Sequence, residues 1–151
     1  MKRKTFIEII SSLLILLFVY AAVSKLLDYP TFRVQLGRSP FIAGFSGILA
    51  WALPAFELII ALMLMFRRFR LAGLYASLFM MSLFTAYIYM MLHFSYYIPC
   101  SCGGVLSKMN WNQHLAFNVF FVVLSIAGIV AEARLYDPPV VEEKEPFVVF
   151  T

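Results

Sequence analysis

The chain has 151 residues, of which 63% are hydrophobic and only 13% are charged. A soluble domain is about 50% apolar at most, so this composition indicates a membrane protein and excludes a water-soluble globular domain. The formal net charge of +4 does not suggest a nucleic-acid partner, because most basic residues lie in short segments beside apolar runs, where they orient membrane proteins.

Four apolar runs stand out, at residues 6–27, 45–66, 71–92 and 115–135. At about 1.5 Å per residue, a helix over each run just crosses a hydrocarbon core of roughly 30 Å. The runs are too long for barrel strands, and a helix satisfies its own backbone groups in lipid. We therefore predict an all-α membrane protein, a bundle of four transmembrane helices over residues 1–136, followed by a cytoplasmic tail at 137–151.

The first run follows basic residues at positions 2–4 and contains the pair Ala21-Ala22, a pattern that also fits a cleaved signal peptide. The run is longer than the apolar core of a signal, and Glu8 interrupts it early, which favours a retained helix. Cleavage would remove one helix without changing which side of the membrane the later loops face. The first outer loop, at residues 28–44, is predicted to hold a short amphipathic segment in the membrane interface.

Glu57 lies in the middle of the second run, three residues after Pro54. A carboxylate at that depth is costly and normally faces the bundle interior with a partner. Lys25, in the outer third of the first run, is the nearest candidate by depth, and a tyrosine hydroxyl is the alternative. Glu57 either links helices or relays protons beside a bound quinone. Linking is favoured, because a polar side chain in a bundle needs no further role.

In the third run, Gly73 and Ser77 form a pair of small residues one turn apart. Such pairs allow two membrane helices to approach closely. We expect this face of the third helix to contact a neighbour.

The loop after the third run carries the only two cysteines, in the segment Cys100-Ser-Cys102-Gly-Gly. In an extended C-x-C segment the Cα atoms lie near the upper limit for a disulfide, about 6.8 Å, so a bridge closes only with strain. Strained, exposed disulfides exchange readily. Because the bridge closes almost no loop, it would stabilise little. Redox exchange is therefore favoured over a bridge that only pins the loop.

A metal site is the third interpretation of this loop, since His93 and His114 bracket the cysteines. Two thiolates and two imidazoles can bind Zn²⁺ or copper. The spacing H-x6-C-x-C-x11-H is not a standard zinc pattern, so no metal site is predicted. If His114 approaches the sulfurs, it can instead stabilise a thiolate. Asn118 follows one turn later and is expected to bond across the bundle or to cap loop carbonyls.

The basic residues also predict orientation. With both termini in the cytoplasm, eight of the twelve Lys and Arg lie inside, and four lie outside: Lys25, Arg33, Arg38 and Lys108. The cysteine loop then faces the periplasm or the cell exterior, where disulfides persist. We predict a multi-pass protein of the bacterial inner membrane, with Glu8 and Glu132 at the cytoplasmic interface.

Together these residues resemble the MauE-like and DoxX-like families of small four-helix membrane proteins, over nearly the whole chain. Ser24-Lys25 is similar to a Ser-Lys pair that ends the first helix in these families, and Pro54-x-x-Glu57-Leu to their second-helix signature. The segment Cys100-Ser-Cys102-Gly-Gly, followed by Trp111, His114 and Asn118, is similar to the third-loop motif of these families. The usual MauE motif is C-x-C-F-G, and Gly103 stands here in place of Phe, so methylamine metabolism is not carried over.

The resemblance implies a redox function. MauE is implicated in disulfide formation during maturation of methylamine dehydrogenase, and the DoxX group is linked to sulfur and quinone redox. The resemblance implies that Cys100 and Cys102 exchange electrons with an extracytoplasmic thioredoxin-like or substrate protein. A quinone is the candidate electron carrier. The supporting residues would be Lys25, Glu57, His114 and Asn118. The alternative is a non-enzymatic small subunit or assembly factor of a larger membrane complex, with a structural disulfide.

Overall fold

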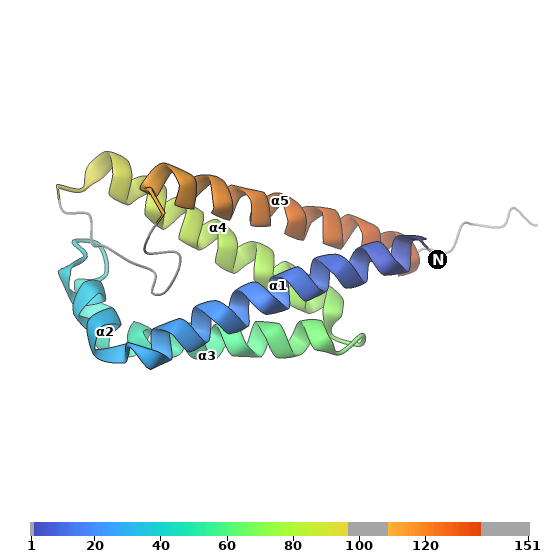
Figure 1. Cartoon of the computed structure of the whole chain (residues 1–151), viewed down its shortest axis with the longest axis horizontal. Helices are drawn as coiled ribbons and strands as arrows, with labels where there is room; N and C mark the ends of the chain where they lie inside the picture. The colour runs from blue at the N-terminus through green and yellow to red at the C-terminus, as the bar shows by residue number, and fades with distance from the viewer. Residues whose placement is uncertain (1, 97–108, 137–151) are drawn as a thin grey trace, which may run out of the picture.

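A computed structural model describes residues 2–96 and 109–136 of the chain. Within those ranges every regular element is helical, as predicted (Figure 1). The elements are α1 (Lys2–Leu27), α2 (Tyr29–Arg38), the 3₁₀ helix η1 (Ala43–Phe45), α3 (Ser46–Met65), α4 (Arg70–Phe94) and α5 (Trp111–Tyr136).

Four helices of the described part are long and apolar enough to cross a membrane: α1, α3 together with η1, α4 and α5. The four predicted spans are therefore confirmed, but the helices extend beyond several of their ends. Helix α1 begins at Lys2 and α5 at Trp111, whereas the apolar runs begin at residues 6 and 115. Hydrophobicity marks only the part in hydrocarbon, and the helical hydrogen bonds continue through the polar residues beside it.

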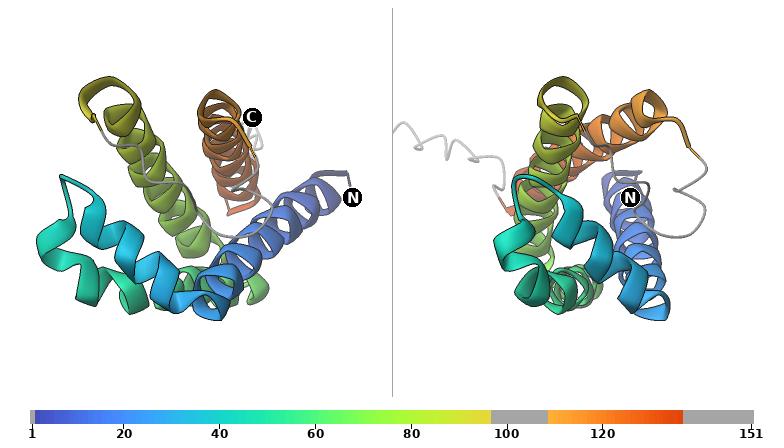
Figure 2. Two further views of the ribbon diagram at one scale, coloured as in Figure 1. Left: turned by 60° about the vertical axis from the view of Figure 1, so that its left-hand side comes forward. Right: turned by 90° about the vertical axis from the view of Figure 1, so that its left-hand side faces the viewer.

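The first outer loop contains a helix, α2, where the sequence predicts a short amphipathic segment. Pro30 lies in the first turn of α2, where its missing N–H costs no hydrogen bond. Leu36 is buried, and α2 packs against α3 at one end of the bundle (Figure 2). Placement of α2 in the membrane interface stays a prediction.

The four long helices form a closed bundle. Helix α1 packs along α3 and α4 along α5, while contacts between α3 and α4 and between α1 and α5 complete the ring. The start of α1, the turn at residues 66–69 and the end of α5 lie at one end, and α2 lies at the other (Figure 1). This arrangement is the one that a topology with both termini on one side requires. Which side faces the cytoplasm stays a prediction.

The core and the outer surface of the bundle are both apolar. Leu14, Phe18 and Leu74 are at most 1% exposed in the core. On the outside, Leu16, Phe79 and Val123 are each more than half exposed. Large apolar side chains spread over the whole outer surface indicate contact with lipid rather than water.

Helices α3 and α4 approach closely at Gly73, as the pair of small residues predicts. A Cβ atom on Gly73 would lie 3.1 Å from the backbone nitrogen of Leu64 and 3.2 Å from its Cγ. Ser77 is fully buried, and its Oγ donates to the carbonyl of Gly73 at 2.7 Å. The absence of a side chain at Gly73 therefore sets the distance between these two helices.

We expect Gly73→Ala to destabilise the bundle, because the added methyl meets the backbone of α3, which cannot turn aside. The matched control is Gly37→Ala in α2, where the added Cβ lies at an ordinary 3.7 Å from the Oγ of Ser46. Both changes gain the same helix propensity, so their difference isolates the overpacking, about 1–3 kcal/mol. Thermal unfolding in detergent measures it. Equal melting temperatures for the two variants would show that the close contact is not tight.

Candidate functional site

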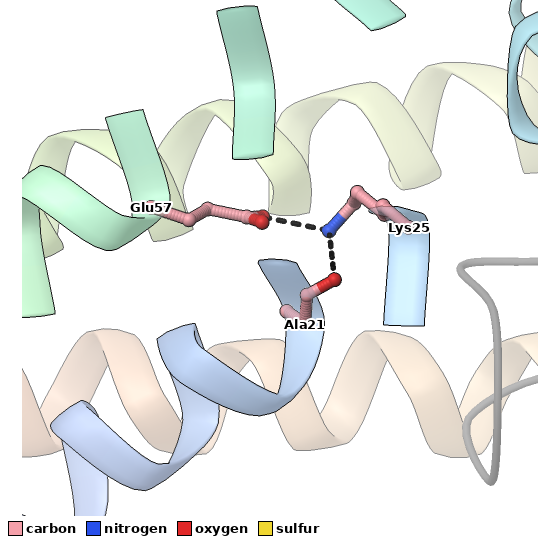
Figure 3. Close-up of polar contacts among 3 residues, drawn as sticks. All are labelled: Ala21, Lys25 and Glu57. Carbon is pink, nitrogen blue, oxygen red and sulfur yellow. Dashed lines mark hydrogen bonds and ion pairs between the residues drawn. The ribbon is translucent and has the colours of Figure 1, made fainter. Parts of the chain in front are cut away.

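A buried ion pair joins α1 to α3. The Nζ of Lys25 lies 2.7 Å from the Oε1 of Glu57 (Figure 3), and the two side chains are 5% and 0% exposed. Lys25 stands in the last turn of α1, and Glu57 follows Pro54 by nearly one turn of α3. The sequence-based expectations that Glu57 faces the bundle interior and that Lys25 is its partner are confirmed.

The ammonium group of Lys25 is enclosed on several sides. It also donates to the carbonyl of Ala21 at 3.4 Å (Figure 3). The rings of Phe32 and Phe84 lie with their centroids 5.9 Å and 5.6 Å from Nζ, within the range of a cation–π interaction. A buried cation therefore has a carboxylate, a carbonyl and two aromatic faces in place of water.

The carboxylate of Glu57 is only half satisfied. Its Oε2 is buried and has no hydrogen-bond partner among the described residues. Glu57 and Lys25 line a cavity of about 50 Å³ that also borders α4 and α5. A water molecule occupies about 30 Å³ in the liquid, so the cavity has room for one or two waters beside the carboxylate. The open oxygen can accept a hydrogen bond or a proton there.

His114 and Asn118 line the same cavity from α5. They stand four residues apart on one face of the helix, and their side chains are 6% and 5% exposed. The Trp111 ring lies 6.2 Å from that of His114, between centroids. The four residues expected to support the chemistry, from three different helices, thus meet at one cavity.

Cys100 and Cys102 lie outside the described residues. Their segment joins the end of α4 at Phe94 to the start of α5 at Trp111, which is the end of α5 that carries His114. The predicted disulfide and its reactivity therefore stay predictions.

The metal interpretation depends on Cys100 and Cys102 and therefore lies outside the described residues. No group of three or more His, Cys, Asp or Glu residues that could hold a metal ion occurs among residues 2–96 and 109–136. His93 is exposed on α4 and stacks at a tilt on Tyr89, with 4.4 Å between ring centroids. His114 is buried, so the two histidines have different environments.

The hydrogen bond of Tyr87 and its position at the cavity were not predicted from the sequence. Its hydroxyl donates to the Oγ of Ser39 at 2.8 Å, and Ser39 is fully buried at the end of α2. Tyr87 also lines the cavity of Glu57. Nothing in the local sequence separates Tyr87 from the other tyrosines near helix ends, because its partner comes from a loop that is distant along the chain.

The ion pair should be strongly coupled. Lys25→Met alone leaves the Glu57 carboxylate buried without a cation, and Glu57→Leu alone leaves the Lys25 ammonium in the same state. Each should cost about 3–5 kcal/mol, because loss of one partner strands a buried charge. The double variant should be more stable than the sum of the two losses predicts. Unfolding in detergent measures all three.

The matched control is the exposed pair of Arg67 and Glu8, which is 3.2 Å apart with side chains 79% and 50% exposed. Glu8→Gln should change stability little, since exposed pairs contribute about 0–1 kcal/mol. Strictly additive effects at Lys25 and Glu57 would contradict the inferred coupling.

A family model described as "Methylamine utilisation protein MauE" matches residues 3–131 of the chain. The matched region contains α1 to α4, most of α5 and all four residues that meet at the cavity. Comparisons with curated proteins and with solved structures gave no match. The resemblance to MauE is thus confirmed, while the resemblance to the DoxX group stays an expectation. With a match over most of its length and four helices able to span a bilayer, the chain is a multi-pass membrane protein of the MauE family.

Proposed function

We propose that this protein carries out thiol–disulfide exchange at the outer face of the bacterial inner membrane, through Cys100 and Cys102. One observation above all supports the proposal. Lys25, Glu57, His114 and Asn118 meet at a buried cavity at the end of α5 to which the cysteine segment is joined. Buried ionisable groups within a membrane bundle are costly and generally mark a functional site.

The exchange balances between the cysteine pair and its partner protein. A thiolate of the pair attacks a partner disulfide, and a mixed disulfide forms as one partner thiolate leaves. The second cysteine attacks the mixed disulfide, which yields the Cys100–Cys102 bridge and a dithiol in the partner. Two electrons pass to the partner, and the protons from the pair's two thiols are transferred to the two partner thiolates. The reverse sequence oxidises the partner by the same steps.

The buried cluster has two roles in this proposal. The ion pair between Lys25 and Glu57 holds α1 against α3 beside the cavity that His114 and Asn118 also line. The imidazole of His114 and the free Oε2 of Glu57 accept and return the protons that leave and re-enter the thiols. Asn118 orients the polar groups within the cavity. These are roles in positioning and proton transfer, while the sulfur chemistry belongs to the cysteines.

The volume that the described residues leave at this cavity is smaller than a quinone ring needs. The cavity measures about 50 Å³, whereas a cavity that binds benzene measures about 150 Å³. We therefore assign no step to a quinone. The partner is an extracytoplasmic protein that carries a reactive cysteine pair, either a thioredoxin-like protein or the protein whose disulfide is formed. The family description refers to methylamine utilisation, but Gly103 departs from the family's usual motif, so we do not propose an amine-related partner.

The proposed orientation is testable with reporter fusions. A reporter after Arg70 should read as cytoplasmic and one after Lys108 as extracytoplasmic, because eight of the twelve basic residues then lie inside. A periplasm-active phosphatase and a cytoplasm-active fluorescent protein give opposite signals at each site. The reverse pattern would place the cysteines in a reducing compartment and remove the basis for the exchange.

Single cysteine variants should capture the partner. With Cys100→Ala or Cys102→Ala, the mixed disulfide cannot be resolved and should persist. Acid quenching followed by electrophoresis should show a heavier species, sensitive to reductant, from at least one single variant and none from the double variant. Mass spectrometry of that species identifies the partner.

Glu57→Gln is a further variant for the same experiment, and it tests the proposed role of the carboxylate in proton transfer. It keeps the shape of the side chain and a hydrogen bond to Lys25 but removes the proton-accepting charge. The variant should be less stable, because Lys25 loses its buried counter-ion, and it should change the oxidised fraction of the cysteine pair in the molecules that remain folded, as a melting curve in detergent recorded beside the redox assay shows. If no single variant captures a partner and the double variant functions as the unaltered protein does, the bridge is structural and the protein is a subunit or assembly factor of a larger complex.

A further inference from the structure

A second polar cavity lies at the opposite end of the bundle from α2. It is formed by the start of α1, the turn between α3 and α4, and the end of α5. Five charged side chains line it: Lys4, Glu8, Arg67, Arg70 and Glu132. Its volume of about 230 Å³ exceeds the liquid volume of a water molecule, about 30 Å³, several times over. The cavity can therefore hold a polar group larger than a bridging water.

The charges in this cavity do not satisfy one another. Arg67 and Glu8 pair at 3.2 Å on the exposed side. Glu132 is only 6% exposed, and its Oε2 has no hydrogen-bond partner in the described part of the chain. The Nε of Arg70 is also buried without a partner there. One cavity thus holds an unsatisfied acceptor and an unsatisfied donor, and each is costly to leave unpaired.

We infer that this cavity binds a phosphoethanolamine group. Its phosphate oxygens accept from the guanidinium of Arg70 and the ammonium of Lys4, which are the side chains suited to phosphate. Its primary ammonium donates to the free Oε2 of Glu132. A simple anion would leave Glu132 unsatisfied and repelled. A phosphocholine group carries no N–H and cannot donate to the carboxylate.

The position of the cavity favours a membrane lipid as the source of this group. The cavity lies at the ends of helices that are long and apolar enough to span a membrane, and basic pockets between transmembrane helices bind lipid headgroups. Further along the same two helices, large apolar side chains are exposed, including Ile9 and Leu13 on α1 and Val130 on α5, at 40–54%. They offer a surface for acyl chains. Phosphatidylethanolamine fits both the headgroup chemistry and this surface.

Native mass spectrometry of the delipidated protein tests the inference. The probes are phosphatidylethanolamine, phosphatidylcholine and phosphatidylglycerol with the same acyl chains. We expect phosphatidylethanolamine to bind at least tenfold more tightly than phosphatidylcholine, and also more tightly than phosphatidylglycerol. Glu132→Gln should reverse the order of the ethanolamine and glycerol lipids, because it removes the buried negative charge that the described residues contribute to the cavity. Arg70→Gln should weaken all three.

Arg68→Gln is the matched control, since Arg68 lies in the same turn, is exposed and does not line the cavity. It should leave the lipid order unchanged. Equal binding of the ethanolamine and choline lipids, or an equal effect of Arg68→Gln and Arg70→Gln, would overturn the site. If Glu132→Gln does not change the order of the lipid affinities, the proposed site is also wrong, and water links Arg70 and Glu132 instead.

Free phosphoethanolamine distinguishes the two sources of the group. Displacement of the lipid by millimolar phosphoethanolamine, but not by phosphocholine, supports the headgroup chemistry. If the free compound binds as tightly as the diacyl lipid, a soluble metabolite is the ligand and the assignment to lipid is wrong. A melting curve of each variant, recorded in the same detergent, separates loss of binding from loss of fold.

Discussion

The ion pair between Lys25 and Glu57 sets the register of the bundle. Two charges that leave water must meet in good geometry, because the desolvation of each costs several kcal/mol in a low-dielectric interior. Lys25 lies close to the end of α1, whereas Glu57 lies roughly 16 Å into α3 at 1.5 Å per residue. When the two meet, α3 must extend beyond the end of α1. Helix α2 lies against that extension of α3 (Figure 2), so the ion pair also determines where the outer loop packs.

Three buried or half-buried hydroxyl groups bond within their own helices. Ser77, Thr85 and Ser125 each donate to the carbonyl four residues earlier in their own helix, so they satisfy themselves and leave packing to apolar contacts. In the described ranges, the ion pairs between elements include Lys25 of α1 with Glu57 of α3, and Glu8 of α1 with Arg67 in the turn before α4. One pair is buried below the outer loop, and the other is exposed at the opposite end. The buried pair is thus the stronger of these two links, and apolar packing holds the helices together along the rest of the described bundle.

The sequence predicted the features that carry a large energetic cost. The four spans follow from the need to fill a hydrocarbon core, and the inward orientation of Glu57 follows from the cost of a carboxylate in lipid. Depth alone then identified Lys25 as the partner. The contact between Tyr87 and Ser39 and the burial of Glu132 were not predicted. Near a helix end a polar side chain can reach water or turn inward at similar cost, so only the packing of the neighbouring helices decides between them.

Glu57 and Glu132 differ in whether the described part of the protein provides an ion partner for the carboxylate. Both carboxylates are at least nine-tenths buried, and both have an Oε2 without a partner in the described part of the protein. Glu57 has a cation 2.7 Å from its other oxygen, and its cavity is just large enough for water, so its charge is balanced within the bundle. Glu132 has no such cation among the described residues, and its cavity is about 230 Å³. A paired carboxylate beside a small cavity suits proton transfer, whereas a buried carboxylate oxygen without a partner beside a larger, charged cavity suits the binding of a polar group.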